Sequence, residues 1–118
     1  MNYEFTLPWP PSINGYWRAF RNRQIISKRG REYRTNAVNQ LKELGLFNEN
    51  IAKPLSVTLT LNPPTLRRYD VDNFNKALFD ALTHGSFWLD DEQVCKLTII
   101  KGEKIKGGNV IVKVEVME

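Results

Sequence analysis

Alternating apolar and polar residues predict four β-strands along this chain. In a strand every second side chain lies on the same face, so a half-buried strand alternates between the two types. Residues 3–7 and 55–61 show this alternation most clearly, and residues 95–99 and 110–116 repeat it. Prolines follow the first two of these segments, and proline ends a strand because it lacks a backbone donor. We expect Gly107-Gly108 to form a hairpin turn between the last two strands.

Two segments with a helical spacing of apolar residues separate the strands. We expect the first helix to begin after Ser27 as its N-cap and to end at Gly45. The second runs from about Asp72 to Thr83 and ends at Gly85. Residues 15–26 mix aromatic and arginine side chains and predict either an irregular hairpin or a mobile loop. The apolar faces of the two helices are expected to be Tyr33, Ala37, Leu41 and Leu44 in the first, and Phe74, Ala77, Leu78, Ala81 and Leu82 in the second.

The order of these elements predicts an α+β (mixed α/β) fold. Residues 1–118 are expected to form a small single domain with a mixed β-sheet and two main helices, because 118 residues and 13.7 kDa suit one domain. The lone cysteine, Cys95, excludes an intramolecular disulfide, and its place in a strand pattern predicts a buried side chain. Neither a secretory signal nor a membrane span is expected, so we predict a cytoplasmic protein without a membrane partner.

The net charge of +4 is unevenly distributed along the chain. Residues 1–69 carry a balance of +7, residues 70–92 a balance of −5, and residues 93–118 a balance of +2. A protein that only held nucleic acid would gain nothing from grouping its carboxylates, because they repel phosphate. A divalent cation would resolve this conflict, since it takes anionic oxygen ligands and attracts phosphate. A chance cluster of acids on a solvated surface explains the counts equally well.

The acidic segment contains an ordered set of polar residues around the start of the second helix. Asp70 and Asp72 are two residues apart in an extended stretch, so their side chains share one side. If the helix begins near Asp72, then Asp72, Lys76 and Asp80 form a line at four-residue spacing. Taken alone, aspartates at a helix start are more often caps than metal ligands, and such a lysine is more often a surface partner.

A second acidic cluster, Asp90-Asp91-Glu92, favours the interpretation as a metal site. A turn back along the second helix would bring Asp91 to Asp70 and Asp72. Three neighbouring carboxylates are costly unless cations balance them. We therefore expect Mg²⁺, with Mn²⁺ as the alternative cofactor, held by these carboxylates.

The remaining sequence argues against other chemistries. One cysteine and one histidine cannot form the usual zinc cluster. His84 falls at an expected helix C-terminus, where interaction with the helix dipole is the ordinary role. The sequence has no phosphate-loop, dinucleotide-binding or serine-nucleophile motif, so no nucleotide cofactor is expected.

Seven of the 17 basic residues fall between Arg18 and Arg34, and six of the seven are arginine. Arginine suits phosphate groups, which favours contact with nucleic acid. A solvated helix face is the alternative explanation of these charges. Tyr16, Trp17 and Phe20 interleave with the first of them, and either stack on exposed bases or belong to the core.

Three blocks of the sequence resemble the RusA family of Holliday junction resolvases, small endonucleases of phage and prophage origin. Together the blocks span about residues 5–95, and the third is the most specific. Tyr69 departs from the family pattern, in which this position is often basic or proline. The blocks are Leu7-Pro8-Trp9-Pro10-Pro11-Ser12-x-Asn14-x-Tyr16-x-Arg18, then Ser27-x-x-Gly30-x-x-Tyr33-Arg34, then Asp70-x-Asp72-Asn73-x-x-Lys76-Ala77-x-x-Asp80-Ala81-Leu82 with Trp88-x-Asp90-Asp91-x-Gln93-Val94.

The resemblance implies a homodimeric, Mg²⁺-dependent endodeoxyribonuclease that resolves four-way DNA junctions by paired symmetric nicks, in DNA recombination and repair. It assigns metal binding to Asp70, Asp72 and Asp91, and an essential catalytic role to Lys76. Two other functions stay open: a non-catalytic DNA-binding or assembly protein, and a metal nuclease that acts on flaps or other branched DNA. Contact with DNA is expected of Asn14, Arg18, Arg21, Arg23, Lys28, Arg29, Arg67 and Arg68.

Overall fold

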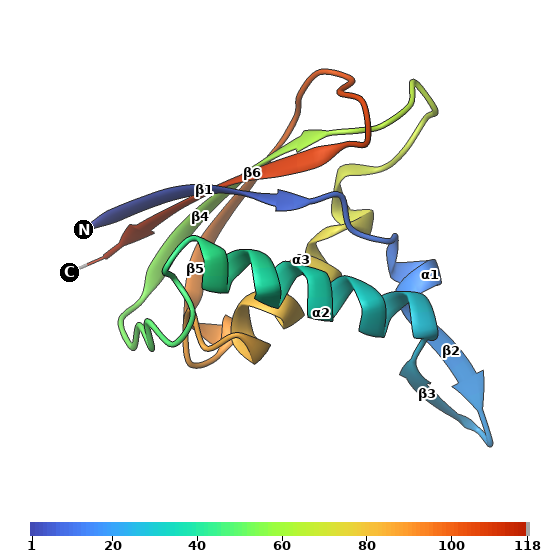
Figure 1. Ribbon diagram of the computed structural model, residues 1–118, viewed down its shortest axis with the longest axis horizontal. Helices are drawn as coiled ribbons and strands as arrows, with labels where there is room; N and C mark the ends of the chain where they lie inside the picture. The colour runs from blue at the N-terminus through green and yellow to red at the C-terminus, as the bar shows by residue number, and fades with distance from the viewer. Residues whose placement is uncertain (118) are drawn as a thin grey trace.

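The computed structural model describes residues 1–117 and contains a four-stranded sheet, two long helices on one face of that sheet, and a separate two-stranded hairpin (Figure 1). The strand order is β1-β6-β4-β5, with β4 and β5 parallel and the other neighbours antiparallel. This mixed sheet with its two main helices confirms the predicted α+β class. The four strands are β1 (Asn2–Pro8), β4 (Leu55–Asn62), β5 (Val94–Lys101) and β6 (Asn109–Val116), and the helices are α2 (Lys28–Glu43) and α3 (Asn75–His84).

Strand β4 lies inside the sheet and supplies the centre of the core. Leu55, Val57, Leu59 and Leu61 are all fully buried on the face that the helices cover. Fully burying a side chain of this size contributes on the order of 1.5–3 kcal/mol, so this one strand accounts for a large share of the apolar stabilisation. The alternation in the sequence predicted this strand because every second residue must enter the core.

Helix α2 begins where the sequence predicts. The Ser27 hydroxyl accepts a hydrogen bond from the Gly30 amide at 2.9 Å, which satisfies one of the free amides of the first turn. Tyr33, Ala37 and Leu41 are buried as expected. The prediction for Leu44 is wrong, because α2 ends at Glu43 and the chain turns away through Gly45 at φ +75°, which leaves Leu44 44% exposed.

The second long helix begins later than predicted. The chain first forms a 3₁₀ turn, η1 (Val71–Asn73), and α3 starts only at Asn75. Between them the chain places the Phe74 ring in the core, 4.8 Å from the ring of Trp9. Asp72 therefore lies outside the helix that carries Lys76, and the predicted line at four-residue spacing is reduced to Lys76 and Asp80.

The prediction of a hairpin between the last two strands is wrong. Helix α3 carries the chain from β4 to its parallel neighbour β5, so β6 pairs with the opposite edge of β4. Residues 102–108 cross the end of β4, where the Gly102 amide donates to the Leu61 carbonyl at 2.7 Å and the Ile105 amide donates to the Pro63 carbonyl at 2.9 Å. Gly107, at φ +79°, turns the chain within this crossing.

Cys95 is exposed, which corrects the prediction of a buried side chain. It belongs to β5, which lies at one edge of the sheet and has no buried residue. An alternating pattern identifies a strand but does not tell whether another layer covers it.

Residues 13–26 form a hairpin rather than a loop. After the short helix α1 (Ile13–Tyr16), strands β2 (Trp17–Phe20) and β3 (Arg23–Ile26) pair in antiparallel fashion. Arg21 and Asn22 connect them with positive φ values of 49° and 64°, as in the two-residue turns that suit the twist of a hairpin. The hairpin extends away from the sheet and helices (Figure 1).

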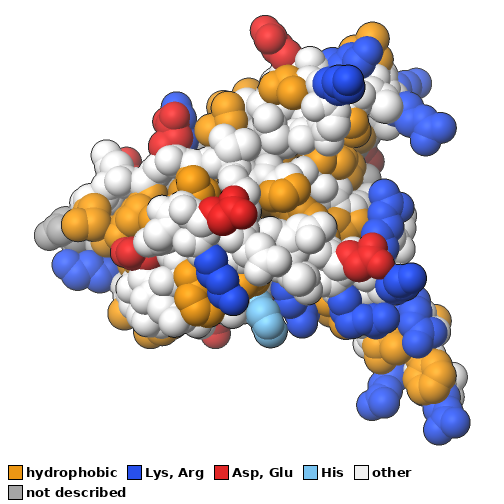
Figure 2. Space-filling view, in the orientation of Figure 1, with side chains coloured by type: hydrophobic (Ala, Val, Ile, Leu, Met, Phe, Trp, Pro, Cys, Tyr) orange, Lys and Arg blue, Asp and Glu red, His pale blue; other side chains and the backbone are white. Residues whose placement is uncertain are grey.

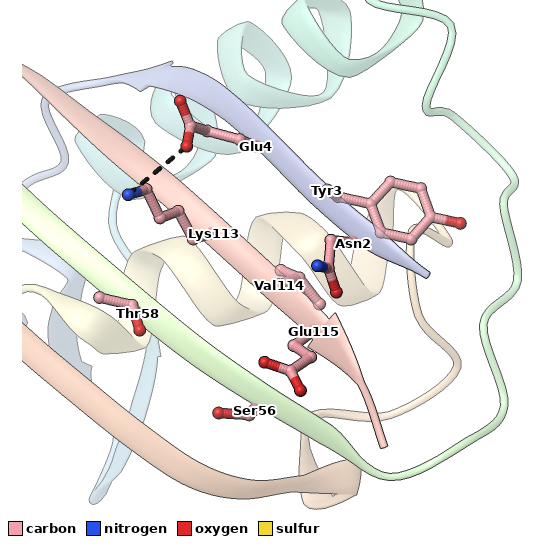
Figure 3. Close-up of a pocket in the computed structure, with 8 residues that line it drawn as sticks. All are labelled: Asn2, Tyr3, Glu4, Ser56, Thr58, Lys113, Val114 and Glu115. Carbon is pink, nitrogen blue, oxygen red and sulfur yellow. Dashed lines mark ion pairs between the residues drawn. The ribbon is translucent and has the colours of Figure 1, made fainter. Parts of the chain in front are cut away.

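The face of the sheet opposite the helices is open and polar. A depression of about 320 Å³ lies over β1, β4 and β6 (Figure 3), and the carboxylate of Glu4 pairs there with the Lys113 ammonium at 3.5 Å. None of the residues predicted for catalysis lines this depression. Within residues 1–117, no helix is long and apolar enough to cross a membrane.

Candidate active site

Lys76 is held in the first turn of α3 by an acidic neighbour one turn later. Its Nζ lies 3.1 Å from Asp80 Oδ1 in a partly buried ion pair. Asp80 Oδ2 accepts a hydrogen bond of 2.8 Å from the Tyr16 hydroxyl, and Arg34 Nη2 donates to that hydroxyl at 3.5 Å. Side chains from α1, α2 and α3 thus fix the position of one ammonium group.

Tyr16 is fully buried beneath this ion pair, so it belongs to the core and cannot stack on a base. Burial, followed by the hydrogen bond to Asp80, raises the pKa of Tyr16 to about 12, which keeps the hydroxyl protonated and able to donate. Tyr16 and Arg34 were not among the predicted site residues. In the sequence both lie within the blocks that resemble the RusA family and within the basic, aromatic-containing stretch, but neither signal predicts their contact with Asp80.

Asp91 lies close to the same ammonium group from a second direction. It opens the 3₁₀ turn η2 (Asp91–Gln93), which packs against α3 and leads directly into β5. Burial raises the pKa of the Asp91 carboxyl, as do a hydrogen bond to Asp90 and the charges of Asp90 and Asp80, while Lys76 lowers it. The favourable charge of Lys76 therefore offsets only part of the effect of burial, the hydrogen bond and the neighbouring carboxylates on the pKa of Asp91.

Asp90 has a clear structural role in this turn. Its Oδ1 accepts a hydrogen bond from the Glu92 amide at 3.0 Å, and Gln93 Oε1 accepts one from the Asp90 amide at 2.8 Å. These reciprocal bonds form a capping box that fixes η2. Gln93 Nε2 also donates to the carbonyls of Ile51 and Lys53, both at 2.9 Å, which anchors the turn carrying Asp91.

Asp70 and Asp72 lie in and beside η1, which packs against β5. Both side chains are exposed, and within residues 1–117 neither forms a hydrogen bond or an ion pair. Asp70 occupies the N-cap position of η1 without making a side-chain capping bond, so capping does not explain it.

The described part of the chain gathers no three His, Cys, Asp or Glu side chains in an arrangement that could hold a metal ion. Asp91 thus lies with Lys76, Asp80 and Asp90, and not in one ligand set with Asp70 and Asp72. The chemistry of the donors nonetheless suits a hard divalent cation. All three predicted ligands offer carboxylate oxygens, two are unpaired, and the third has its pKa raised in part by neighbouring carboxylates.

The residues predicted to contact DNA are all exposed. Most lie on α1, the hairpin and the first turn of α2, and Figure 2 shows cationic side chains gathered over the projecting hairpin. Arg67 and Arg68 lie in the loop between β4 and η1. The set is Asn14, Arg18, Arg21, Arg23, Lys28, Arg29, Arg67 and Arg68, and of these Lys28 also pairs with Glu32 at 3.9 Å.

The hairpin also presents an aromatic ring. Phe20 is 40% exposed, and the guanidinium groups of Arg18 and Arg21 lie 5.4 and 5.2 Å from the centre of its ring. Trp17 is half-buried at the base of the hairpin, and Lys76 Nζ lies 5.8 Å from its ring centre. The hairpin base therefore adjoins the candidate site.

Comparison with known proteins gives one consistent family. The profile of a family described as Endodeoxyribonuclease RusA matches residues 8–117. A Shigella sonnei protein named Crossover junction endodeoxyribonuclease RusA is 43% identical over 108 residues, which cover 92% of this chain and 89% of that protein. Proteins of the same name from Escherichia coli K12 and Enterobacteria phage 82 are 42% and 43% identical over the same shares of both chains.

Proposed function

The chain belongs to the Endodeoxyribonuclease RusA family, and on this basis we propose that it cuts four-way DNA junctions by metal-dependent hydrolysis of phosphodiester bonds. The name shared by its relatives supports the substrate class, because it specifies a crossover junction. We propose the cytoplasm of a bacterial host as the place of action, where such DNA occurs. The product would be a junction resolved by two symmetric nicks.

Asp70 and Asp72 from η1 and Asp91 from η2 would supply the carboxylate ligands of the metal, although the described chain does not hold the three in one ligand set. Mg²⁺ is the first candidate and Mn²⁺ the second. A bound divalent cation lowers the pKa of an attacking water and neutralises charge on the phosphate. The carboxylates of η1 and η2 come from segments that pack against β5 and α3 respectively. Asp70 and Asp72 are exposed and Asp91 is half-buried, so a cation and DNA can reach all three carboxylates.

Lys76 would stabilise the negative charge that develops on the phosphate or on the leaving oxygen. Its ion pair with Asp80 directs the ammonium, and 38% of the Lys76 side chain remains exposed to a substrate. The hairpin and the first turn of α2 would bind the DNA backbone through their arginines. These contacts give affinity and position rather than recognition of sequence.

We further propose that the working form is a homodimer. A four-way junction has two-fold symmetry and needs two matched cuts, whereas each chain offers one set of candidate residues. A dimer with a two-fold axis supplies two sites in the same symmetry.

The observation that carries this function is the cluster of Lys76, Asp80, Asp90 and Asp91 beside a strongly basic hairpin in a chain of this family. The test is competition between a labelled four-way junction and a linear duplex of the same sequence, with Mg²⁺ and with EDTA. We expect cleavage of the junction alone and only with the metal. A DNA-binding protein would leave both substrates intact, and a nuclease with broader specificity would cut added flap substrates at a similar rate.

Replacing Asp72 by Asn tests the proposed metal ligands. The Asp72→Asn variant should lose junction cleavage by at least about 100-fold, since a neutral amide is a poorer ligand for a hard cation. Binding to the junction in EDTA should persist, which gel-shift titration measures. Glu92→Gln removes a carboxylate from the same acidic segment and should keep activity. Wild-type cleavage by Asp72→Asn would rule out this metal site.

A further inference from the structure

Two loops lie side by side at the end of the sheet where β4 stops. Residues 63–69 lead from β4 towards η1, and residues 101–108 lead from the end of β5 to β6. The backbone joins them, because the Ile105 amide donates to the Pro63 carbonyl at 2.9 Å. These two segments are called the paired loops below.

A buried amide at the end of β4 holds the paired loops in place. Asn62 is only 5% exposed, and its Oδ1 accepts a hydrogen bond from the Glu103 amide at 3.1 Å. Its Nδ2 donates to Asn109 Oδ1 at 2.9 Å, which ties the same side chain to the start of β6. The packing is close, since a Cβ on Gly108 would lie 2.8 Å from Pro64 Cδ. The two loops are therefore fixed to each other and to the sheet.

The paired loops carry as much net positive charge as the entire chain. They contain five basic residues and one acid, a balance of +4, which equals the net charge of the chain, so the remaining residues sum to zero. The five basic side chains are exposed, and within residues 1–117 none of them forms an ion pair. Unpaired cations at this density attract phosphate. The acid is Glu103, and the basic residues are Arg67, Arg68, Lys101, Lys104 and Lys106.

The paired loops and the hairpin of β2 and β3 lie on two sides of the candidate site. Lys101 Nζ lies 4.6 Å from the centre of the Tyr69 ring, and Tyr69 directly precedes Asp70. At the base of the hairpin, Trp17 lies beside Lys76. Both segments project from the same side of the molecule, with η1 set back between them in this view (Figure 1), and both carry cationic side chains (Figure 2). Two basic projections thus flank the candidate site.

This arrangement suits DNA that changes direction at the site. The persistence length of duplex DNA is ~50 nm, whereas the molecule measures 40 Å along its longest axis, so a duplex is a straight rod on this scale. A straight duplex resting on both projections would pass over the carboxylates set back between them. At the branch point of a four-way junction, the DNA on the two sides of a cut belongs to different arms, which diverge without bending of either duplex.

We propose that the paired loops form a second DNA-binding surface, which holds one arm of a four-way junction while the hairpin holds the neighbouring arm. The proposal rests on the proposed function and deepens it, because it names the part of the chain that distinguishes a junction from a linear duplex. A junction engages both surfaces at once, whereas a linear duplex engages one at a time. The surface adds Lys101, Lys104 and Lys106 to the residues expected to contact DNA.

Replacing Lys104 and Lys106 by Gln tests this surface in gel-shift titrations with EDTA. Junction affinity should fall at least about 10-fold and the slope of log K against log salt should become less steep by ~2, since each phosphate contact contributes about 0.9. Affinity for a linear duplex of the same sequence should fall by no more than about 2-fold, because the hairpin remains as an alternative surface. An unchanged junction affinity, or an equal loss for both substrates, would overturn the proposal.

The matched control removes two lysines from another part of the surface. Lys96 and Lys113 pair with Ser56 and Thr58 of β4, so both lie on the open face of the sheet. Lys96→Gln with Lys113→Gln changes the net charge by the same amount and should leave both affinities and both slopes as in wild type. A loss of junction affinity equal to that of the Lys104 and Lys106 variant would show that only net charge matters, which would also overturn the proposal.

A second measurement changes the DNA and holds even if the double variant fails to fold. Neutral methylphosphonate linkages are placed in one symmetry-related pair of junction arms at a time. Wild-type affinity in EDTA should fall for both of the arm pairs that flank the cut, and sensitivity to one pair alone would overturn the second surface. The Lys104 and Lys106 variant should be insensitive to neutral linkages in one of these pairs, because the contact is already lost.

These binding measurements separate the second surface from the proposed function. Both are made in EDTA, so their outcome does not depend on cleavage. Wild-type protein that binds both arm pairs but leaves the junction uncut with Mg²⁺ would overturn the proposed function alone. Wild-type protein that cuts the junction but is sensitive to one arm pair would overturn the second surface alone.

Discussion

At the residue scale, Asp91 carries an electrostatic cost that the folded chain does not relieve. Burial and the nearby carboxylates of Asp90 and Asp80 raise the pKa of Asp91, and Lys76 offsets only part of this effect. A carboxyl whose pKa is higher in the folded state stabilises that state while the carboxyl is protonated. This stabilisation is fully present below the pKa that the carboxyl has in the unfolded chain. That contribution is lost as the pH rises through the raised value.

The Asp91→Asn variant should therefore unfold at a higher urea concentration than wild type at about pH 7 in EDTA. The difference should shrink as the pH falls below about 4, the ordinary pKa of this side chain, because wild-type Asp91 is then protonated. Urea unfolding at several pH values measures the effect, and Glu92→Gln, an exposed acid in the same turn, is the control. A variant no more stable than wild type at about pH 7 would contradict this account of Asp91.

We expect the Tyr16 hydroxyl to affect the reaction through two other side chains, because a hydrogen bond links it to Asp80 and an ion pair links Asp80 to Lys76. Tyr16→Phe keeps the buried ring but leaves Asp80 free to move with its ammonium partner. We expect the rate constant of junction cleavage to fall about 10-fold, equivalent to ~1.4 kcal/mol, with little change in the affinity for the junction.

The matched control for this variant is Tyr33→Phe. Tyr33 is also buried, but its hydroxyl donates to the Pro8 carbonyl at 2.8 Å and has no link to Lys76. Both variants should lose stability by about 1 kcal/mol, and only Tyr16→Phe should slow cleavage. Equal cleavage rates for the two variants would show that Tyr16 is structural only.

The charged residues of the candidate site could be predicted from the sequence more fully than the buried residue that positions them. Asp91 and Lys76 could be predicted because each belongs to a short charged motif whose spacing is visible in the chain. Tyr16 lies 64 positions from Asp80, and only the packing of α1 beside α3 brings them together. Asp90 was ambiguous from the sequence, since a metal ligand and a capping residue look the same until the capping bonds of η2 are known.

At the scale of elements, the hairpin formed by β2 and β3 concentrates arginine on a segment that adds little to the core. Replacing Arg21 and Arg23 together should weaken junction binding for every sequence, because phosphate contacts carry no sequence information. Asn suits the positive φ of Arg21 and Gln suits β3, so Arg21→Asn with Arg23→Gln should keep the fold.

The salt dependence of binding gives the quantitative readout for these hairpin variants. Each lost phosphate contact should reduce the slope of log K against log salt by about 0.9, so the double variant should show a slope less steep by ~2. Lys113→Gln removes the same type of charge from the open face of the sheet and should leave the slope unchanged. An unchanged slope in the hairpin variant would show that the hairpin does not contact the DNA backbone.

Elements whose position depends on the local sequence pattern could be predicted. Elements whose position depends on contacts between segments far apart in the sequence could not. The alternation of β4 and the Ser27 cap of α2 are local, and both are confirmed. The late start of α3 results from the burial of Phe74 against Trp9, which is far away in the sequence. Strand β6 pairs with β1 and β4 instead of β5, which likewise depends on the order of strands in the sheet. The Gly107-Gly108 pair predicts a turn but does not predict which strands pair.

At the scale of the whole molecule, a two-fold dimer predicts that each copy cuts one strand of the junction. Each chain has a single copy of the Asp70, Asp72 and Asp91 set, and a junction is resolved only when two nicks are made in symmetric positions. Mixed dimers would separate these two events, because one copy would then be inactive while the substitution leaves the dimer itself intact.

We expect a dimer of one wild-type and one Asp72→Asn chain, purified through two different affinity tags, to nick a junction without resolving it. On a supercoiled plasmid with an extruded cruciform, the wild-type dimer should give linear product by paired cuts, whereas the mixed dimer should give nicked circles. The fraction of linear product should fall at least about 10-fold, measured on an agarose gel before chains exchange. A mixed dimer with Glu92→Gln in place of Asp72→Asn is the control and should linearise the plasmid. Linear product at the wild-type rate from the Asp72→Asn mixed dimer would mean that one site makes both cuts, and the two-fold dimer would then have no role in resolution.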